Sequence, residues 1–161
     1  MKKLILVRHA KSSWEYDVID HERPLKKRGI NDANIVSKNL KTKNFEFDKV
    51  LSSDALRAKA TANIFKVGLS FKNEIELNHK LYDFSGRDML EVIKSCDNNV
   101  ETLLVFGHNH AITDFANTYG NYYIDNVPTS GVVVIEFEID NWGILCRGNT
   151  ICKLFPRDYR V

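Results

Sequence analysis

An arginine and a histidine directly follow the first apolar run of the chain. Residues 4–7 are apolar without alternation, and the run breaks abruptly into Arg8 and His9. The guanidinium of arginine matches the oxygens of a phosphate or carboxylate, and histidine can act as a nucleophile or proton carrier near neutral pH. Arg8 and His9 are therefore candidates for binding an anion and reacting with it. The alternative is a strand edge that ends in two solvated polar residues.

A second histidine occupies an equivalent position. The apolar run of residues 102–106 ends in Gly107 and His108. Glycine permits a tight turn, so His108 is expected to face the same crevice as His9. His110 nearby raises the possibility of a metal site, but no cysteine or acidic cluster accompanies this pair. The pattern favours phosphate binding over zinc.

Arg57 completes this set of donors. It falls in the first turn of a helix expected to begin at Asp54, with Ser53 as its N-cap. A cation is unfavourable at the positive end of a helix dipole unless an anion lies between them. Two arginines and two histidines suit a tetrahedral oxyanion: an imidazole can accept a phosphoryl group, and cationic donors stabilise it in transfer without a metal.

Further candidates lie in two connecting segments. Residues 11–27 form a long polar loop, and long ordered loops are often functional. Within it, Ser12 and Arg23 are candidates for substrate binding. Asp83 is a possible general acid, although a solvated carboxylate is the favoured interpretation. His79 is interpreted as a surface histidine.

The elements that must position these residues indicate an α/β fold. Continuous apolar strands suit a parallel sheet covered on both faces, where ligands bind outside the carboxyl ends of the strands. A hairpin is expected near the C-terminus, with strands at 132–135 and 144–146 around a turn at 140–143. The inward stripes of the first two helices are predicted to be Ile30, Ala33, Val36 and Leu40, and then Leu56, Ala60, Ile64 and Val67.

Composition limits the functional classes. The 161 residues suit one domain spanning 1–161, and a formal charge of +2 implies no strong attraction to nucleic acid or membranes. Arg8 ends the first apolar run too early for an export signal, and no membrane span is expected. The three cysteines form no Cys-x-x-Cys pair, which favours reduced thiols in a cytoplasmic protein.

The order of the motifs resembles the histidine phosphatase superfamily, whose relatives include phosphoglycerate mutases, and in particular its small SixA-type phosphohistidine phosphatase branch. The resemblance covers nearly the whole chain. It rests on Arg8-His9-Ala10, Arg23-Pro24-Leu25 with Arg28-Gly29, Ser52-Ser53 with Arg57-Ala58 and Thr61-Ala62, Gly107-His108-Asn109, Pro128-Thr129-Ser130-Gly131 and Pro156-Arg157-Asp158.

The resemblance implies a phosphoglycerate-mutase-like three-layer sandwich, with a mainly parallel sheet, helices on both faces and an antiparallel hairpin at one edge. It further implies that His9 is the phosphorylated nucleophile, that Arg8 and Arg57 clamp the phosphoryl oxygens, and that His108 stabilises the transition state. Arg23 would assist from the loop, and no metal or cofactor is required. Ala10 replaces the glycine of the family motif, a minor departure.

The expected activity is metal-independent phosphate hydrolysis, with protein phosphohistidine as the leading substrate. The mutase relatives carry a glutamate proton donor in mid-chain, and residues 81–87 offer no convincing match. Two alternatives remain open: a phosphatase for a small phosphorylated metabolite, and a phosphate-binding module without turnover. The sequence determines neither the physiological substrate, nor the partner protein, nor the oligomeric state.

Overall fold

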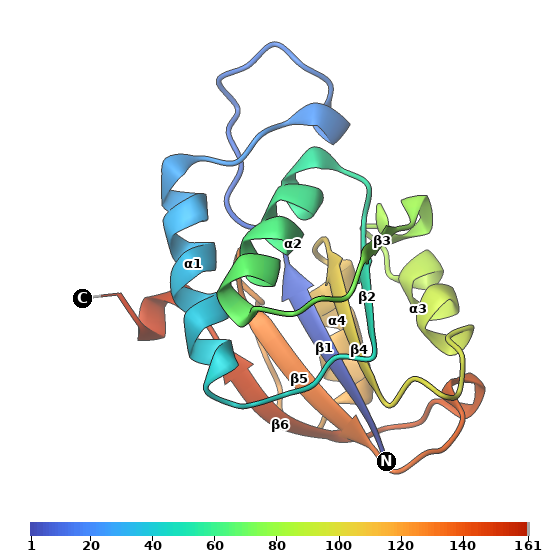
Figure 1. Cartoon of the computed structure of the whole chain (residues 1–161). Helices are drawn as coiled ribbons and strands as arrows, with labels where there is room; N and C mark the ends of the chain where they lie inside the picture. Colours follow the sequence, from blue (N-terminus) through green and yellow to red (C-terminus); the bar gives the residue numbers. More distant parts are fainter. Residues whose placement is uncertain (161) are drawn as a thin grey trace.

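A six-stranded mixed sheet forms the middle layer of the computed structural model, which describes residues 1–160 (Figure 1). The strand order is β3-β2-β4-β1-β5-β6. The first four of these pair in parallel, whereas β5 and β6 form an antiparallel hairpin at one edge. The strands are β1 (Lys2–Arg8), β2 (Lys49–Ser52), β3 (Ile75–Leu77), β4 (Thr102–Gly107), β5 (Val132–Phe137) and β6 (Asn149–Leu154).

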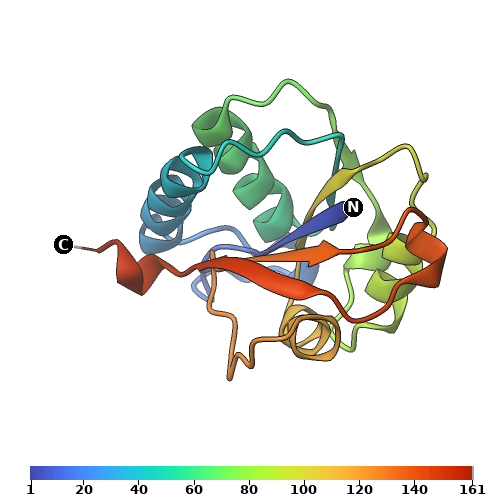
Figure 2. The ribbon, with the colours of Figure 1, turned by 90° about the horizontal axis from the view of Figure 1, so that it is seen from below.

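Four α-helices cover the two faces of this sheet, two on each side (Figure 2). One face carries α1 (Lys27–Lys41) and α2 (Leu56–Leu69), and the other carries α3 (Arg87–Lys94) and α4 (Ala111–Tyr119). Short 3-10 helices lie in the connections: η1 (Asp20–Glu22), η2 (His79–Leu81), η3 (Trp142–Ile144) and η4 (Pro156–Asp158). The predicted three-layer α/β sandwich is confirmed.

The central strand β1 explains why its apolar run does not alternate. Leu4 and Leu6 belong to the core under α3 and α4, whereas Ile5 and Val7 belong to the core under α1 and α2. All four side chains are fully buried. A strand covered on both faces needs apolar residues at every position, and β1 is such a strand.

The predicted inward stripe of α2 is wrong at its two ends, although Ile64 is half-buried against the core. Leu56 and Val67 are exposed, and the buried residues of this helix are Arg57, Ala58, Thr61, Ala62 and Phe65. The prediction counted only apolar residues, but the inner face of α2 also holds a guanidinium and a hydroxyl group that belong to the site described below. The helix also begins at Leu56 rather than Asp54.

Two smaller expectations also need correction. Ile30, placed in the inward stripe of α1, is exposed, although the other three residues of that stripe are buried. Residues 144–146 do not form the second strand of the hairpin, since that strand is β6. Trp142 interrupts the extended sequence because its buried ring packs into the core and its Nε1 atom donates to the carbonyl oxygen of Val100 at 2.9 Å. Within residues 1–160, no helix is long and apolar enough to cross a membrane.

Candidate active site

The register between β1 and β4 places His9 beside His108. The two strands are parallel, and Arg8 is paired with Gly107. Each histidine is the next residue after this pair, and the backbone N–H of His9 donates to the carbonyl oxygen of Gly107 at 3.0 Å. The two ring centroids are 5.2 Å apart. Strand register thus brings together two residues separated by nearly a hundred positions in the sequence.

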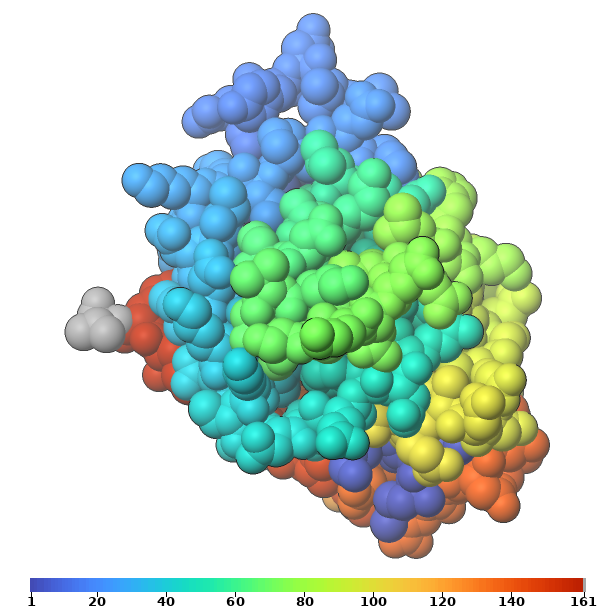
Figure 3. Space-filling view, viewed as in Figure 1, coloured from blue at the N-terminus to red at the C-terminus, as the bar shows by residue number. Residues whose placement is uncertain are grey.

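A pocket of about 570 Å³ opens in front of His9. The loop after β1 supplies most of its wall, and this loop projects above α1 and α2 (Figures 1 and 3). His108 is buried beside His9 and is not among the residues that line the pocket. The lining residues are Arg8, His9, Lys11, Ser12, Trp14, Asp20, Arg23, Lys26, Arg57, Phe84, Asn109 and Thr129.

The tautomer of His9 follows from a single hydrogen bond. Its Nδ1 atom lies 2.7 Å from the carbonyl oxygen of Ala10, which can only accept. Nδ1 therefore carries the proton, and the lone pair of Nε2 is free. Burial, together with the nearby guanidinium groups of Arg57 and Arg8, lowers the pKa of His9 to about 3, although the hydrogen bond to Ala10 opposes the shift. His9 is thus a neutral imidazole with an available nucleophilic nitrogen at neutral pH.

His108 is held by a serine that was predicted only as a helix cap. Its Nε2 atom lies 2.8 Å from the hydroxyl oxygen of Ser53, which also accepts from the backbone N–H of Ala55 at 3.2 Å. With the hydroxyl donating to Nε2, the Nδ1 atom of His108 carries a proton, and it has no hydrogen-bond partner among residues 1–160. Burial, followed by the charges of His9 and Arg57, lowers the pKa of His108 to about 2. His108 is therefore a neutral donor.

Each of the two predicted phosphate-binding arginines has one buried N–H group without a hydrogen-bond partner in the described part of the chain. Arg8 donates from Nη1 to the carbonyl oxygen of Val127 at 2.9 Å, and Arg57 is 2% exposed. In each guanidinium the Nε atom is buried and has no partner within the described part of the chain. A buried N–H without a partner is costly, so both groups are suited to an anion that supplies acceptors.

The loop residues Arg23 and Ser12 form one hydrogen-bonded unit. Arg23 donates from Nη2 to the hydroxyl oxygen of Ser12 at 2.5 Å and from Nε to the carbonyl oxygen of Ser13 at 3.1 Å. Its guanidinium carbon lies 3.3 Å from the ring centre of the exposed Trp14. A bridge between Ser12 and Leu25 closes the base of the loop. Arg23 is therefore a fixed third cation of the pocket, and Ser12 acts mainly by orienting it.

The Arg28-Gly29 motif has a steric explanation in the same loop. A Cβ atom at Gly29 would collide with the backbone carbonyl of Lys11. Lys26 donates from its backbone N–H to that carbonyl at 2.9 Å, which keeps the base of the loop against the start of α1. Only glycine allows this close approach, so the motif serves to seat the loop that carries Arg23.

The segment that leads into β5 is hydrogen-bonded to the backbone of Arg8 and His9. The backbone N–H of Ser130 donates to the carbonyl oxygens of both Arg8 and His9 at 3.1 Å. Ser130 has a left-handed backbone, with φ 63°, and its neighbour Thr129 lines the pocket. The Thr129-Ser130-Gly131 motif thus fixes the end of β1 in place.

Asp20 is part of the site and was not predicted. Arg57 donates to it from Nη2 at 2.9 Å, Arg23 donates from Nη1 at 3.1 Å, and the hydroxyl of Tyr82 donates at 2.5 Å. Partial burial raises the pKa of the Asp20 carboxyl, but these hydrogen bonds outweigh it and lower the pKa to about 2. The spacing of Asp20 and Arg23, three residues apart, was the only available signal, and such pairs are usually surface ion pairs.

Asp83 is not the solvated carboxylate that the sequence favoured. It is 8% exposed, and it accepts hydrogen bonds from the hydroxyl of Ser85 and from four backbone N–H groups. These groups belong to Ser85, Gly86, Asp88 and Met89 at the start of α3. Burial raises the pKa of Asp83, but the hydrogen bonds, led by that of Met89, lower it overall. Asp83 is an ionised helix cap, which makes it a poor proton donor.

Ala10 fits where the family motif has glycine. Its methyl group is fully buried in the core under α1 and α2. Its backbone N–H donates at 2.8 Å to the hydroxyl oxygen of Thr61, which itself donates to the carbonyl oxygen of Arg57 at 2.7 Å. Thr61 therefore connects the loop after His9 to the helix that carries Arg57, and it appeared in the sequence only as part of a motif.

The amino-acid sequence is similar to that of a known protein family and of its relatives. The profile of the Histidine phosphatase superfamily (branch 1) matches residues 4–98, more than half of the chain. The Uncharacterized protein Rv1276c of Mycobacterium tuberculosis is 30% identical over 140 residues, which cover 81% of this chain and 86% of that protein.

Solved structures share the fold. The protein histidine phosphatase SixA complexed with tungstate has a TM-score of 0.79 and 19% identity, and the alignment covers 98% of this chain and 99% of that one. The putative phosphohistidine phosphatase SixA from Agrobacterium tumefaciens has a TM-score of 0.79 and 22% identity, with 95% and 97% covered. At these identities the likeness establishes the fold alone.

Proposed function

The chain belongs to the histidine phosphatase superfamily, branch 1, and from that premise we propose that it is a metal-independent phosphatase acting on protein phosphohistidine through a covalent intermediate at His9. The observation that carries the proposal is the state of His9. Its Nδ1 atom is committed to the carbonyl oxygen of Ala10, and its Nε2 atom is free and neutral. Three guanidinium groups surround the pocket onto which it opens.

The proposed reaction has two steps, and both take place at the Nε2 atom of His9. In the first, the Nε2 lone pair of His9 attacks phosphorus, the bond from phosphorus to the substrate nitrogen breaks, and the leaving imidazole keeps that electron pair and takes up a proton. In the second, water attacks phosphorus, the bond to His9 breaks, and phosphate leaves. Arg8, Arg57 and His108 supply the donors that balance the charge on the phosphoryl oxygens in flight.

The choice of a phosphohistidine substrate rests on the acids that the site offers. An alkoxide leaving group needs a proton in the transition state, whereas an imidazole is a much better leaving group. Asp83 is committed to the start of α3. Asp20 is ionised, with its pKa lowered to about 2. Neither carboxyl is suited to protonating an alkoxide, which favours a phosphoramidate over a phosphate ester.

A phosphorylated protein is the favoured partner because of the rim of the pocket. Trp14 and Phe84 line the pocket and are 76% and 48% exposed. Exposed aromatic side chains beside a pocket are typical of surfaces that contact proteins.

Cys96, Cys146 and Cys152 are all free thiols, which supports the cytoplasmic location expected from the sequence.

A substrate panel with a nucleophile variant tests the proposal. The wild type should hydrolyse a phosphohistidine peptide with a much higher kcat/KM than phosphoserine peptide or sugar phosphates, and a chelator should not lower the rate. Acid-labile, base-stable phosphate should appear on the wild type during turnover. His9→Ala should lose both label and turnover, whereas His110→Ala, which alters an exposed histidine outside the pocket, should keep both.

Two results would redirect the proposal. A preference for small phosphate esters would make this a metabolite phosphatase, and binding of tungstate without turnover on any substrate would make it a phosphate-binding module. Normal turnover by His9→Ala would contradict the covalent mechanism itself.

A further inference from the structure

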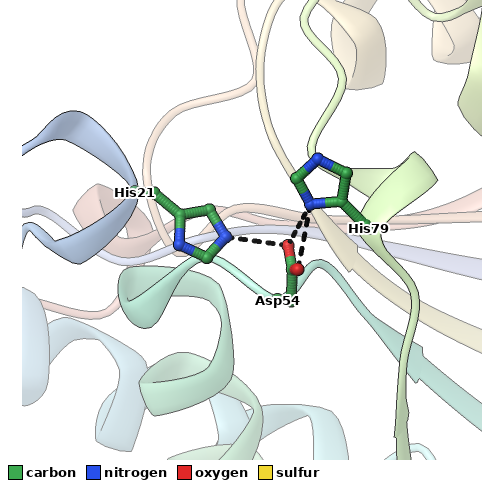
Figure 4. Close-up of side chains that lie close together, drawn as sticks. All are labelled: His21, Asp54 and His79. Atoms are coloured by element: carbon green, nitrogen blue, oxygen red, sulfur yellow. Dashed lines mark hydrogen bonds and ion pairs between the residues drawn. The ribbon is translucent and has the colours of Figure 1, made fainter.

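We propose that His21, Asp54 and His79 form a binding site for a divalent transition-metal ion of the Zn²⁺ type, which fastens the loop after β1 to the body of the protein. The three side chains lie outside the pocket and point toward one another (Figure 4). Within residues 1–160, they are the one group of three or more potential ligands whose donor atoms come together. The site is distinct from the catalytic machinery proposed above.

The geometry of the cluster is close to that of a metal site. The Nε2 atom of His21 lies 2.9 Å from Oδ1 of Asp54, and Nδ1 of His79 lies 2.9 Å from Oδ2. All three donor atoms lie within 4.8 Å of one another. Zinc bonds of about 2.0–2.1 Å in a tetrahedron place ligand atoms about 3.3 Å apart. The two nitrogen–oxygen pairs therefore need to open by about 0.4 Å, and the two imidazole nitrogens, which lie within 4.8 Å of each other, must adjust to the same spacing by side-chain rotation.

The ligand types and their exposure also suit such an ion. Two imidazoles and one carboxylate are a common set for Zn²⁺ sites that keep an open position for water. The side chains of His21 and Asp54 are 30% and 29% exposed, and that of His79 is 73% exposed. An ion can therefore enter from solvent and complete its coordination with water. The ion would replace the two shared protons that now link the rings to Asp54.

Each ligand comes from a different segment of the chain. His21 belongs to η1, Asp54 lies in the turn between β2 and α2, and His79 begins η2. Between them the segments span more than fifty residues, so one ion would join three elements at the carboxyl edge of the sheet. η1 has no buried residue of its own. A bound ion would therefore add a fixed contact to an element that has no buried side chain.

The consequence for catalysis rests on the proposed function. Asp20 directly precedes His21, and its carboxylate is paired with Arg57. The ring of Tyr82 lies edge-on to His21, with centroids 4.9 Å apart, and its hydroxyl donates to Asp20. A metal that holds His21 in place therefore also holds Asp20 on Arg57, where it competes with the phosphoryl group. Zn²⁺ should accordingly weaken vanadate binding and slow turnover without being needed for either.

The test is calorimetric titration of the whole, thiol-alkylated protein with Zn²⁺, together with the visible spectrum after adding Co²⁺. One equivalent should bind to the wild type, and Co²⁺ should give the absorption of a four- or five-coordinate site. His79→Ala should weaken binding at least about tenfold and Asp54→Asn should do the same. His110→Ala, which removes another exposed histidine, should leave binding unchanged. Hydrogen exchange of the η1 amides should slow with Zn²⁺ in the wild type and not in His79→Ala.

The proposal is overturned if the wild type shows no saturable binding, or if His79→Ala and Asp54→Asn bind as the wild type does. His79 is exposed, so loss of the fold should not obscure the result, and His79→Gln provides a second variant of similar size. Metal binding is measured without substrate. If the protein binds Zn²⁺ but hydrolyses no substrate, the metal site is supported and the proposed function is contradicted. If the protein is active but binds no Zn²⁺, the proposed function is supported and the metal site is contradicted.

Discussion

The carboxylate of Asp20 lies 2.9 Å from the Nη2 atom of Arg57, so the guanidinium expected to clamp a phosphoryl group already holds an anion from its own chain. The backbone carbonyl of Asp20 accepts from Nη1 of the same guanidinium at 2.7 Å. A phosphoryl group can use the unpaired Nε atom of Arg57, but one that also binds Nη2 must share that donor with Asp20 or displace it. The Asp20 side chain is 42% exposed, so a displaced carboxylate would have solvent to turn into once its hydrogen bonds to Arg57, Arg23 and Tyr82 were broken.

Replacing Asp20 should therefore strengthen anion binding. Asp20→Asn removes the negative charge beside Arg57 and Arg23, and we expect the Kd for vanadate or tungstate to fall by about tenfold, equivalent to about 1.4 kcal/mol. Isothermal titration measures the change. Asp17→Asn removes a charge from an exposed position of the same loop and should have little effect. Equal or weaker oxyanion binding by Asp20→Asn would show that Asp20 does not compete for the site.

Loss of a single buried donor should reduce turnover sharply. His108→Ala and Arg57→Ala should each lower kcat by about a hundredfold or more, because preorganised donors to the transition state are typically worth that much. Arg57→Lys keeps the charge but loses the forked geometry and should recover only part of the rate. The exposed Arg147 gives the control Arg147→Ala, which should retain full activity. Rates near wild type in the His108 and Arg57 variants would remove these residues from the mechanism.

Asp83 should prove important for stability and dispensable for phosphohistidine hydrolysis. Asp83→Ala leaves four backbone N–H groups at the start of α3 without their acceptor, so the free energy of unfolding should fall by about 1–2 kcal/mol. Urea denaturation measures this, and the exposed control Asp125→Ala should be neutral. The opposite pattern, unchanged stability with loss of activity on an alkyl phosphate, would identify Asp83 as a general acid.

The two buried histidines should make the protein less stable as the pH falls. Their pKa values, about 3 for His9 and about 2 for His108, lie below the value of about 6.5 for an unfolded histidine. The unfolded chain therefore binds more protons below about pH 6.5, and each histidine costs up to about 1.4 kcal/mol of stability per pH unit. Urea unfolding in phosphate-free buffer between about pH 6.5 and 4.5 measures the slope. The double variant His9→Asn, His108→Asn should show a shallower slope, whereas His110→Asn should match the wild type.

Much of the fold could be predicted from residue patterns. Uninterrupted apolar runs at residues 4–7 and 102–106 indicated buried parallel strands, and the structure places Arg8, His9, Arg57 and His108 at the ends of those strands and at the start of a helix. These features are local: a run of apolar residues, a change to polar ones, a glycine turn. The physics that produces them acts within a few residues, so the sequence reveals them.

What could not be predicted depends on distant pairings. Asp20 and Tyr82 meet across 62 positions, and His21 and Asp54 meet across 33. No periodicity encodes such contacts, because they depend on how a loop folds over the sheet edge. Asp83 was misread for a related reason. From the sequence, a carboxylate just before a helix is expected to be solvated unless the path of the chain is known. Here the chain turns so that the backbone N–H groups of Gly86 and Asp88 point at the Asp83 carboxylate.

The position of β1 in the middle of the sheet determines when the active site can exist during synthesis. His9 lies near the start of the chain, but both neighbours of its strand, β4 and β5, come from residues 102–137. A nascent chain that has not yet emerged past these residues exposes both edges of its most apolar strand and has no His108. His9 is thus made well before β4 and β5 and can become competent only after both have joined the sheet. Its reactivity in a growing or truncated chain would report that the sheet is complete.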